Sequence, residues 1–160
     1  TLQRLGYLTR DSTKPRAIEV HTDGKADVAE RRPVRHVPLV GSVAAGTGVI
    51  AQEQIEELLP LPQDLTGDGE LFMLTVRGDS MIDVGIFSGD YVVARQQSTA
   101  DRGDIVVAGI PGEEATVKTL TTHSSEGTTL TPANSTMEPL CYPPGEVVIF
   151  GRVVTVLRKL

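Results

Sequence analysis

From residue 71 onward, the chain consists of short runs of β-forming residues separated by turn residues. The runs are rich in Val, Ile, Thr and Leu, and Gly, Pro and Asp stand between them. β-Branched side chains pack well on a pleated sheet, whereas Gly and Pro interrupt regular structure. The pattern therefore predicts a mainly β domain. The predicted strands lie at 71–77, 90–95, 104–110, 115–121, 127–131 and 146–158.

Size and composition indicate one main domain in the cytoplasm. With 160 residues, of which 39% are hydrophobic, the chain can bury one fair-sized core. No run approaches the roughly 18–20 consecutive apolar residues of a membrane span, and no signal peptide is visible. The single cysteine, Cys141, permits no intrachain disulfide, which is typical of a reducing compartment. We therefore expect a cytoplasmic protein that does not interact with a membrane.

The sequence gives no support to metal or cofactor chemistry. The three histidines, His21, His36 and His123, are scattered and have no paired spacing or cysteine companion. The same scatter argues against a histidine-based triad. No glycine-rich phosphate loop is present either. We therefore expect neither a metal site nor a cofactor.

Charge divides the chain into a basic beginning and an acidic body. Residues 1–36 hold eight Lys and Arg and five Asp and Glu, whereas residues 37–160 hold seven and sixteen. An acidic surface repels phosphate groups. Any contact with nucleic acid is therefore expected from the first segment.

That first segment predicts a helix end followed by a hairpin. Residues 1–6 are typical of a last helical turn closed by Gly6, and residues 7–20 of two short strands around a turn. This order resembles the tail of a winged helix-turn-helix. The hairpin is either a wing whose basic side chains contact phosphate or an ordinary solvated hairpin. Residues 21–36 lack apolar periodicity and predict an interdomain linker.

Ser80 is the candidate nucleophile. The sequence Gly-Asp-Ser-Met at 78–81 closes the apolar run 71–76, and residues 81–87 predict a short helix or an irregular loop. Ser80 is then expected in an N-cap-like place with an exposed hydroxyl. The backbone N–H groups of Ser80 and Met81 would form an oxyanion hole. The alternative is a capping serine in a common turn.

Lys118 is the candidate base for that serine. It lies in the β-type run 115–120, with Val117 and Leu120 beside it. A lysine accepts the proton of a serine only when its amine is neutral, which at pH 7 requires roughly 4–5 kcal/mol of destabilisation of the ammonium. Burial in a sheet supplies such an effect. The two residues together predict a serine–lysine hydrolase; the alternative is a solvent-facing lysine.

A candidate cleavage site lies upstream, at Val43, Ala44, Ala45 and Gly46. The small alanines fit narrow pockets beside a catalytic serine, and Gly46 permits a close approach of backbone to backbone. From these residues alone, a flexible Ala/Gly loop remains the alternative.

Four segments, in this order and spacing, resemble the LexA repressor family, whose C-terminal domain is shared with UmuD-type proteins and phage repressors. The segments are 37–41 (Val-Pro-Leu-Val-Gly), 44–46 (Ala-Ala-Gly), 78–81 (Gly-Asp-Ser-Met) and 115–120 (Ala-Thr-Val-Lys-Thr-Leu). The resemblance runs from about residue 37 to the end, and residues 151–160 resemble the actinobacterial branch. It implies a compact LexA/signal-peptidase-like β domain over 37–160. In that domain Ser80 would be the nucleophile, Lys118 the general base, and Ala45–Gly46 the bond that is cut.

The resemblance also implies a biological role. A repressor of the DNA-damage (SOS) response would inactivate itself by this cut, stimulated by the RecA–single-stranded-DNA filament. It would form a homodimer through the C-terminal domain and bind operator DNA through an N-terminal domain. Of that domain, residues 1–20 would be the C-terminal remnant. Two alternatives stay open: a UmuD-like polymerase accessory protein, and a catalytically inert interaction module.

Overall fold

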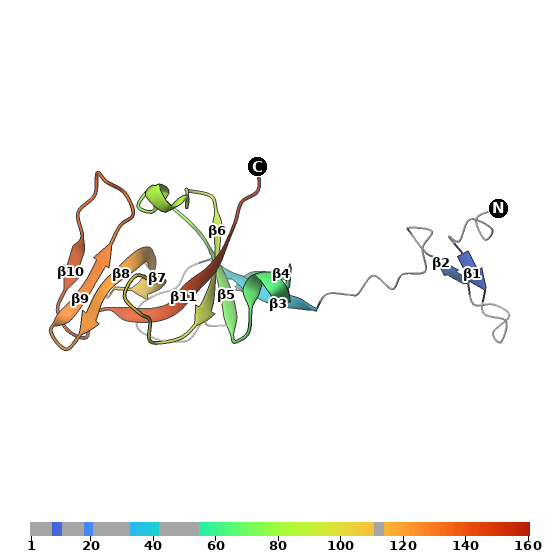
Figure 1. Cartoon of the computed structure of the whole chain (residues 1–160), viewed down its shortest axis with the longest axis horizontal. Helices are drawn as coiled ribbons and strands as arrows, with labels where there is room; N and C mark the ends of the chain where they lie inside the picture. Colours follow the sequence, from blue (N-terminus) through green and yellow to red (C-terminus); the bar gives the residue numbers. More distant parts are fainter. Residues whose placement is uncertain (1–7, 11–17, 21–32, 42–54, 111–113) are drawn as a thin grey trace. The chain divides into compact units, whose positions relative to one another are not determined.

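The computed structural model describes residues 8–10, 18–20, 33–41, 55–110 and 114–160, and the chain divides into two units, Thr1–Arg32 and Pro33–Leu160. In the first unit, strand β1 (Leu8–Arg10) pairs with strand β2 (Ile18–Val20) in antiparallel register (Figure 1). The predicted hairpin is thereby confirmed. The helix end predicted at 1–6 and most of the predicted linker lie outside the described residues.

In the described part of the second unit, one mixed sheet holds nine strands in the order β10-β9-β8-β7-β11-β6-β5-β3-β4. Neighbouring strands are antiparallel, except that β3 and β5 run parallel. Figure 1 shows β8, β9 and β10 at one end of this sheet and β3 and β4 at the other. The strands are β3 (Val34–Val40), β4 (Ile55–Pro62), β5 (Leu71–Thr75), β6 (Tyr91–Gln96), β7 (Ile105–Gly109), β8 (Thr116–Ser124), β9 (Gly127–Thr131), β10 (Leu140–Tyr142) and β11 (Val148–Leu157). The helical elements are α1 (Gln63–Thr66) and a 3-10 helix, η2 (Ile82–Val84).

The predicted mainly β fold is confirmed, and so are the six predicted strands, within a few residues. The sequence missed β3, β4 and β10. Strand β10 is only three residues long, and β4 contains Pro60 and Pro62, which fit because β4 lies at the sheet edge. Strand β3 already begins at Val34, inside the range predicted as linker.

Strand β5 ends shortly before the candidate nucleophile, and it is buried on both of its faces. Successive side chains of a strand point to opposite faces, so β5 contributes alternately to two hydrophobic clusters. Phe72 and Leu74 pack in one cluster with Met81 and Ile86, which follow the nucleophile in the chain. Leu71 and Met73 pack in the other, against β3 and β6. The segment around residue 80 is therefore anchored on both sides by buried side chains.

Candidate active site

Ser80 lies in a turn that the backbone holds tightly where β5 ends. The Val76 N–H donates to the Asp90 carbonyl oxygen (2.7 Å), and the Gly89 N–H donates to the Val76 carbonyl oxygen (2.9 Å). Gly78 then adopts φ = 81°, the left-handed conformation that glycine accepts without strain. Ser80 follows, half-buried, and the Met81 side chain returns to the core. Backbone hydrogen bonds before the serine and the buried Met81 side chain after it therefore hold Ser80 in place.

The predicted N-cap-like place of Ser80 is wrong. Helix η2 has Met81 as its N-cap and no side-chain cap hydrogen bond. The segment after the serine does form the predicted short helix, but only as a single 3-10 turn. Since the Ser80 hydroxyl caps no helix, it faces a different partner.

That partner is Lys118, on β8. The Nζ atom of Lys118 lies 2.9 Å from Ser80 Oγ, 2.6 Å from Thr116 Oγ1 and 3.1 Å from the Val117 carbonyl oxygen. The lysine is only 7% exposed. The structure thus brings together the two residues that the sequence proposed as nucleophile and base.

The surroundings of Lys118 favour its neutral form. Burial lowers the pKa of the amine, because a charge loses its hydration there. The oxygens around Nζ are uncharged, and among the ion pairs of the described residues none includes Lys118. A carboxylate beside Nζ would instead raise the pKa of Lys118. The site therefore lets a lysine accept the proton of the neighbouring serine.

The sequence analysis missed Thr116 as a member of this site. Thr116 and Lys118 are two residues apart on β8, so both side chains point to the same face of the sheet. The Thr116 hydroxyl accepts a hydrogen bond from Nζ and fixes the amine beside the serine. The spacing Thr-x-Lys within a predicted strand was the available signal.

A pocket of about 100 Å³ opens beside the serine, between the end of β5 and the start of β8. Its apolar lining is Leu74, Val76, Met81, Ala115 and Val117. Exposed Arg77 and Glu114 also line it and form an ion pair of 3.7 Å. This size and lining suit small apolar side chains. The candidate cleavage residues Val43, Ala44, Ala45 and Gly46 lie outside the described residues.

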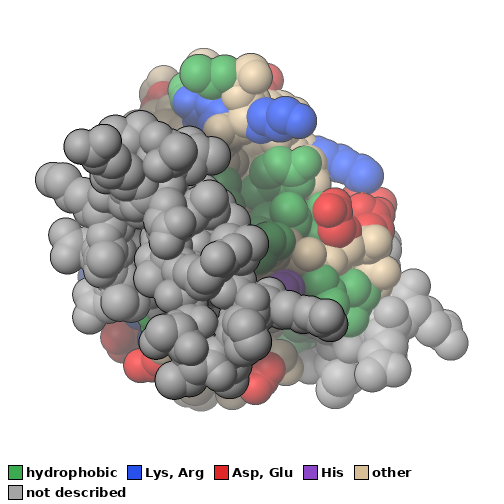
Figure 2. Space-filling view, turned by 90° about the vertical axis from the view of Figure 1, so that its right-hand side faces the viewer, with side chains coloured by type: hydrophobic (Ala, Val, Ile, Leu, Met, Phe, Trp, Pro, Cys, Tyr) green, Lys and Arg blue, Asp and Glu red, His purple; other side chains and the backbone are tan. Residues whose placement is uncertain are grey.

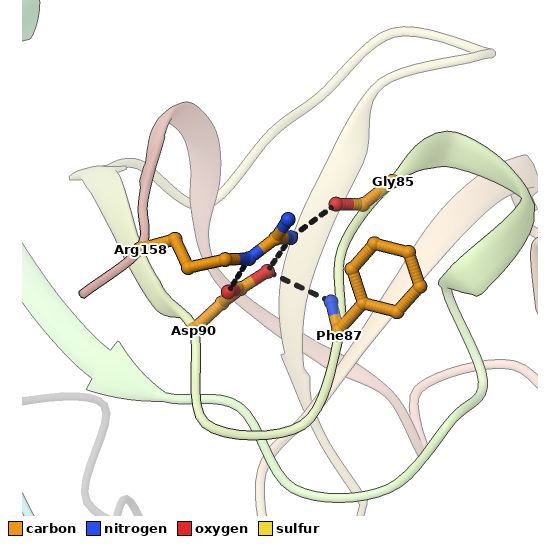
Figure 3. Close-up of polar contacts among 4 residues, drawn as sticks. All are labelled: Gly85, Phe87, Asp90 and Arg158. Carbon is orange, nitrogen blue, oxygen red and sulfur yellow. Dashed lines mark hydrogen bonds and ion pairs between the residues drawn. The ribbon is translucent and has the colours of Figure 1, made fainter. Parts of the chain in front are cut away.

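The segment that follows Ser80, residues 81–90, is hydrogen-bonded to the C-terminal end of the chain (Figure 3). Arg158, just beyond β11, donates from Nε to Asp90 Oδ1 (2.6 Å) and from a terminal nitrogen to Asp90 Oδ2 (2.7 Å) and the Gly85 carbonyl oxygen (2.8 Å). The Phe87 N–H also donates to Asp90 Oδ2 (2.8 Å), and the guanidinium lies 4.6 Å from the centre of the Phe87 ring. We call this group of residues the Asp90–Arg158 clamp.

The clamp depends on an ionised Asp90. Hydrogen bonds from Arg158 hold the pKa of this carboxyl below its usual value, although burial acts in the opposite direction. The same contact raises the pKa of Arg158. Sequence reasoning assigned no role to either residue, because 68 positions separate them and neither stands in a motif.

Within the described residues, no group of three or more His, Cys, Asp or Glu side chains lies close enough to hold a metal ion. Among the helices described, none has the length and apolar character to cross a membrane.

Comparison with known proteins gives one family. The model of the peptidase S24-like family matches residues 38–154, a range that includes both Ser80 and Lys118. The LexA repressor of Mycobacterium sp. (strain KMS) is 45% identical over 171 residues, covering 100% of this chain and 72% of that protein. The LexA repressor of Pelotomaculum thermopropionicum is 50% identical over 159 residues (99% and 75%), and that of Alkaliphilus oremlandii 48% identical over 160 residues (99% and 76%). The mycobacterial relative agrees with the resemblance of residues 151–160 to the actinobacterial branch.

Proposed function

The chain belongs to the LexA repressor family, with a peptidase S24-like domain, and we propose that it represses the SOS regulon and inactivates itself by cutting its own Ala45–Gly46 bond. The observation that carries the proposal is the 2.9 Å distance between Lys118 Nζ and Ser80 Oγ in a buried site. This is the geometry that a serine needs from its base.

In the first half of the reaction, the neutral Lys118 amine takes the Ser80 proton while Oγ bonds to the Ala45 carbonyl carbon. The backbone N–H groups of Ser80 and Met81 stabilise the resulting oxyanion, an effect worth about 3–4 kcal/mol for each donor. The carbon–nitrogen bond then breaks, and the Lys118 ammonium returns its proton to the leaving Gly46 amine. The products of this half are an Ala45 ester on Ser80 and a free Gly46 amine.

In the second half, water releases the ester. Lys118 takes a proton from the water molecule as its oxygen attacks the Ala45 carbonyl carbon. The ester bond to Ser80 Oγ breaks, and Oγ recovers a proton from Lys118. The free Ala45 carboxylic acid then ionises in water.

The pocket beside Ser80 supports this choice of bond. Its apolar lining suits the small apolar side chains of Val43, Ala44 and Ala45. The RecA–single-stranded-DNA filament would act by population shift: a partner that favours the docked cleavage segment raises the rate without adding a catalytic group.

A homodimer through the second unit completes the repressor. Large apolar side chains that remain exposed supply surface for a second copy; they include Val84, Phe87, Val148 and Val156. Figure 2 shows one face on which apolar side chains gather between basic and acidic ones. Operator DNA would be bound by the N-terminal domain, to which the β1–β2 hairpin belongs. A repressor of this kind would act in the cytoplasm.

A UmuD-like polymerase accessory protein is the second candidate, because it would carry the same peptidase domain. The basic segment with its β1–β2 hairpin favours the repressor, since that alternative has no winged helix to account for it. An inert interaction module is opposed by the buried contact between Lys118 and Ser80, for which it offers no reason.

The test is incubation of the chain at about pH 7 with RecA, single-stranded DNA and a nucleotide, followed by intact mass spectrometry. We expect two fragments that meet at Ala45 and Gly46, and no fragments from the Ser80→Ala variant. A cut at another bond would contradict the assignment of the cleavage site. A cut that persists in Ser80→Ala would contradict the assignment of the nucleophile.

A further inference from the structure

The segment between β9 and β10 is bonded directly to the turn that carries the candidate nucleophile. The side-chain amide of Asn134 donates from Nδ2 to the Asp79 carbonyl oxygen (2.9 Å). The Asp83 N–H donates to the Ala133 carbonyl oxygen (2.8 Å), and the Ser135 N–H donates to Asp83 Oδ2 (2.8 Å). Hydrogen bonds thus hold the turn both before and after the serine.

Asn134 is itself held in one orientation. It is 8% exposed, and its Oδ1 accepts from both the Thr136 N–H (3.0 Å) and the Thr136 hydroxyl (2.8 Å). Because a backbone N–H can only donate, the amide oxygen must face Thr136. The amide nitrogen therefore faces Asp79.

Holding the Asp79 carbonyl also fixes the N–H group of the next residue. In a planar trans peptide, the C=O of one residue and the N–H of the following residue point in opposite directions. The peptide that joins Asp79 to Ser80 is trans, so the Ser80 N–H points away from Asn134. Asn134 is not part of the pocket lining, whereas Ser80 and Met81 are.

That N–H group is available for a substrate. In the part of the chain that the structure describes, neither the Ser80 N–H nor the Met81 N–H donates a hydrogen bond to another residue. We infer that Asn134 is a positioning residue that aims the Ser80 N–H at the oxyanion of the cleaved bond. The inference rests on the proposed function, because that function supplies the oxyanion.

Loss of the Asn134 amide leaves the Asp79 carbonyl without this donor and frees the peptide to rotate. Misplacing an oxyanion donor costs about tenfold to a hundredfold in the maximal self-cleavage rate. The pH midpoint of the reaction stays unchanged, because Asn134 makes no contact with Lys118 and its partners at Nζ.

The test uses Asn134→Asp and Asn134→Ala in the full chain, with self-cleavage measured from about pH 6 to about pH 11. Asn134→Asp keeps the acceptor for Thr136, removes the donor to Asp79 and adds a negative charge, while Asn134→Ala removes the donor without adding a charge. The matched control is Gln97→Glu, which removes an amide donor to the Thr99 carbonyl oxygen in a remote turn and adds the same charge. The melting temperature of each variant is measured to confirm that the variant is folded at the assay temperature.

We expect both Asn134 variants to lower the plateau rate, the uncharged Asn134→Ala to keep the parent's pH midpoint, and Gln97→Glu to match the parent. Asn134 variants that cut at the parent's plateau rate would overturn the positioning role alone. In Asn134→Ala, a shifted pH midpoint with an unchanged plateau would overturn it as well, because Asn134 would then act on the base. A parent that stays uncut at every pH would overturn the proposed function together with this inference.

Discussion

Thr116 is the polar side chain that fixes the amine of Lys118 beside Ser80. In Thr116→Val the shape is retained but the acceptor is lost. A neutral hydrogen bond contributes about 1 kcal/mol, so we expect self-cleavage at the pH plateau to slow about fivefold to tenfold. The control is Thr119→Val, on the opposite face of β8. Equal rates for Thr116→Val and Thr119→Val would show that Thr116 does not position the amine.

The residues of the site differ in how well the sequence predicts them. Ser80 and Lys118 stand in motifs whose chemistry restricts the residue type, so both were predicted. Thr116 was detectable only through the two-residue period of its strand. Asn134 acts through a backbone carbonyl 55 positions away, and an asparagine in a polar loop gives no sign of that contact. Positioning residues depend on tertiary structure that a local pattern does not contain.

At the scale of elements, the strands with β-branched residues and clear turns were predicted, and those that depend on tertiary contacts were not. Strand β5 has four consecutive buried residues, which is typical of a strand covered on both faces. Strands β3 and β4 pair with each other over Val34–Val40 and Ile55–Pro62. Their prolines and charged residues conceal that pairing in the sequence.

The Asp90–Arg158 clamp connects the segment that follows Ser80, residues 81–90, with the end of β11. Because the folded-state pKa of Asp90 is lowered, its stabilising effect is present above the pKa of an unfolded aspartate and is lost as the pH falls through the folded-state value. We expect Arg158→Gln to lower the melting temperature at pH 7 by several degrees, since it leaves Asp90 buried without its cation.

The same substitution should also flatten the loss of stability in acid, because the shift in the Asp90 pKa depends mainly on Arg158. Thermal unfolding from about pH 2 to about pH 7 measures both effects. Arg77→Gln is the control, because its exposed partner Glu114 contributes little to stability. If Arg158→Gln and Arg77→Gln melt alike at every pH, the clamp does not stabilise the fold.

At the scale of the whole molecule, self-cleavage at Ala45–Gly46 would divide the chain into a basic and an acidic fragment, since residues 37–45 hold no charged side chain. Residues 1–36 carry a net charge of +3 (eight minus five) and residues 37–160 a net charge of −9 (seven minus sixteen). A basic module that binds DNA weakly gains affinity when a dimer links two copies, because the second contact becomes intramolecular. A cut at Ala45–Gly46 falls inside the second unit, after β3, so the link is removed only when β3 separates from β4 and β5 in the sheet. The proposed switch therefore requires one peptide bond to break and the pairing of β3 with its neighbours to open.

The central claim is that a buried, neutral Lys118 activates Ser80 to cut the chain that contains it. The most direct measurement is the rate of self-cleavage of the full chain alone, followed by intact mass from about pH 6 to about pH 11. Since burial lowers the pKa of Lys118, we predict that the rate rises with pH and reaches its plateau below the titration range of an exposed lysine. Ser80→Ala and Lys118→Ala should stay uncut. A rate that does not change with pH, or cleavage in either variant, would contradict the account.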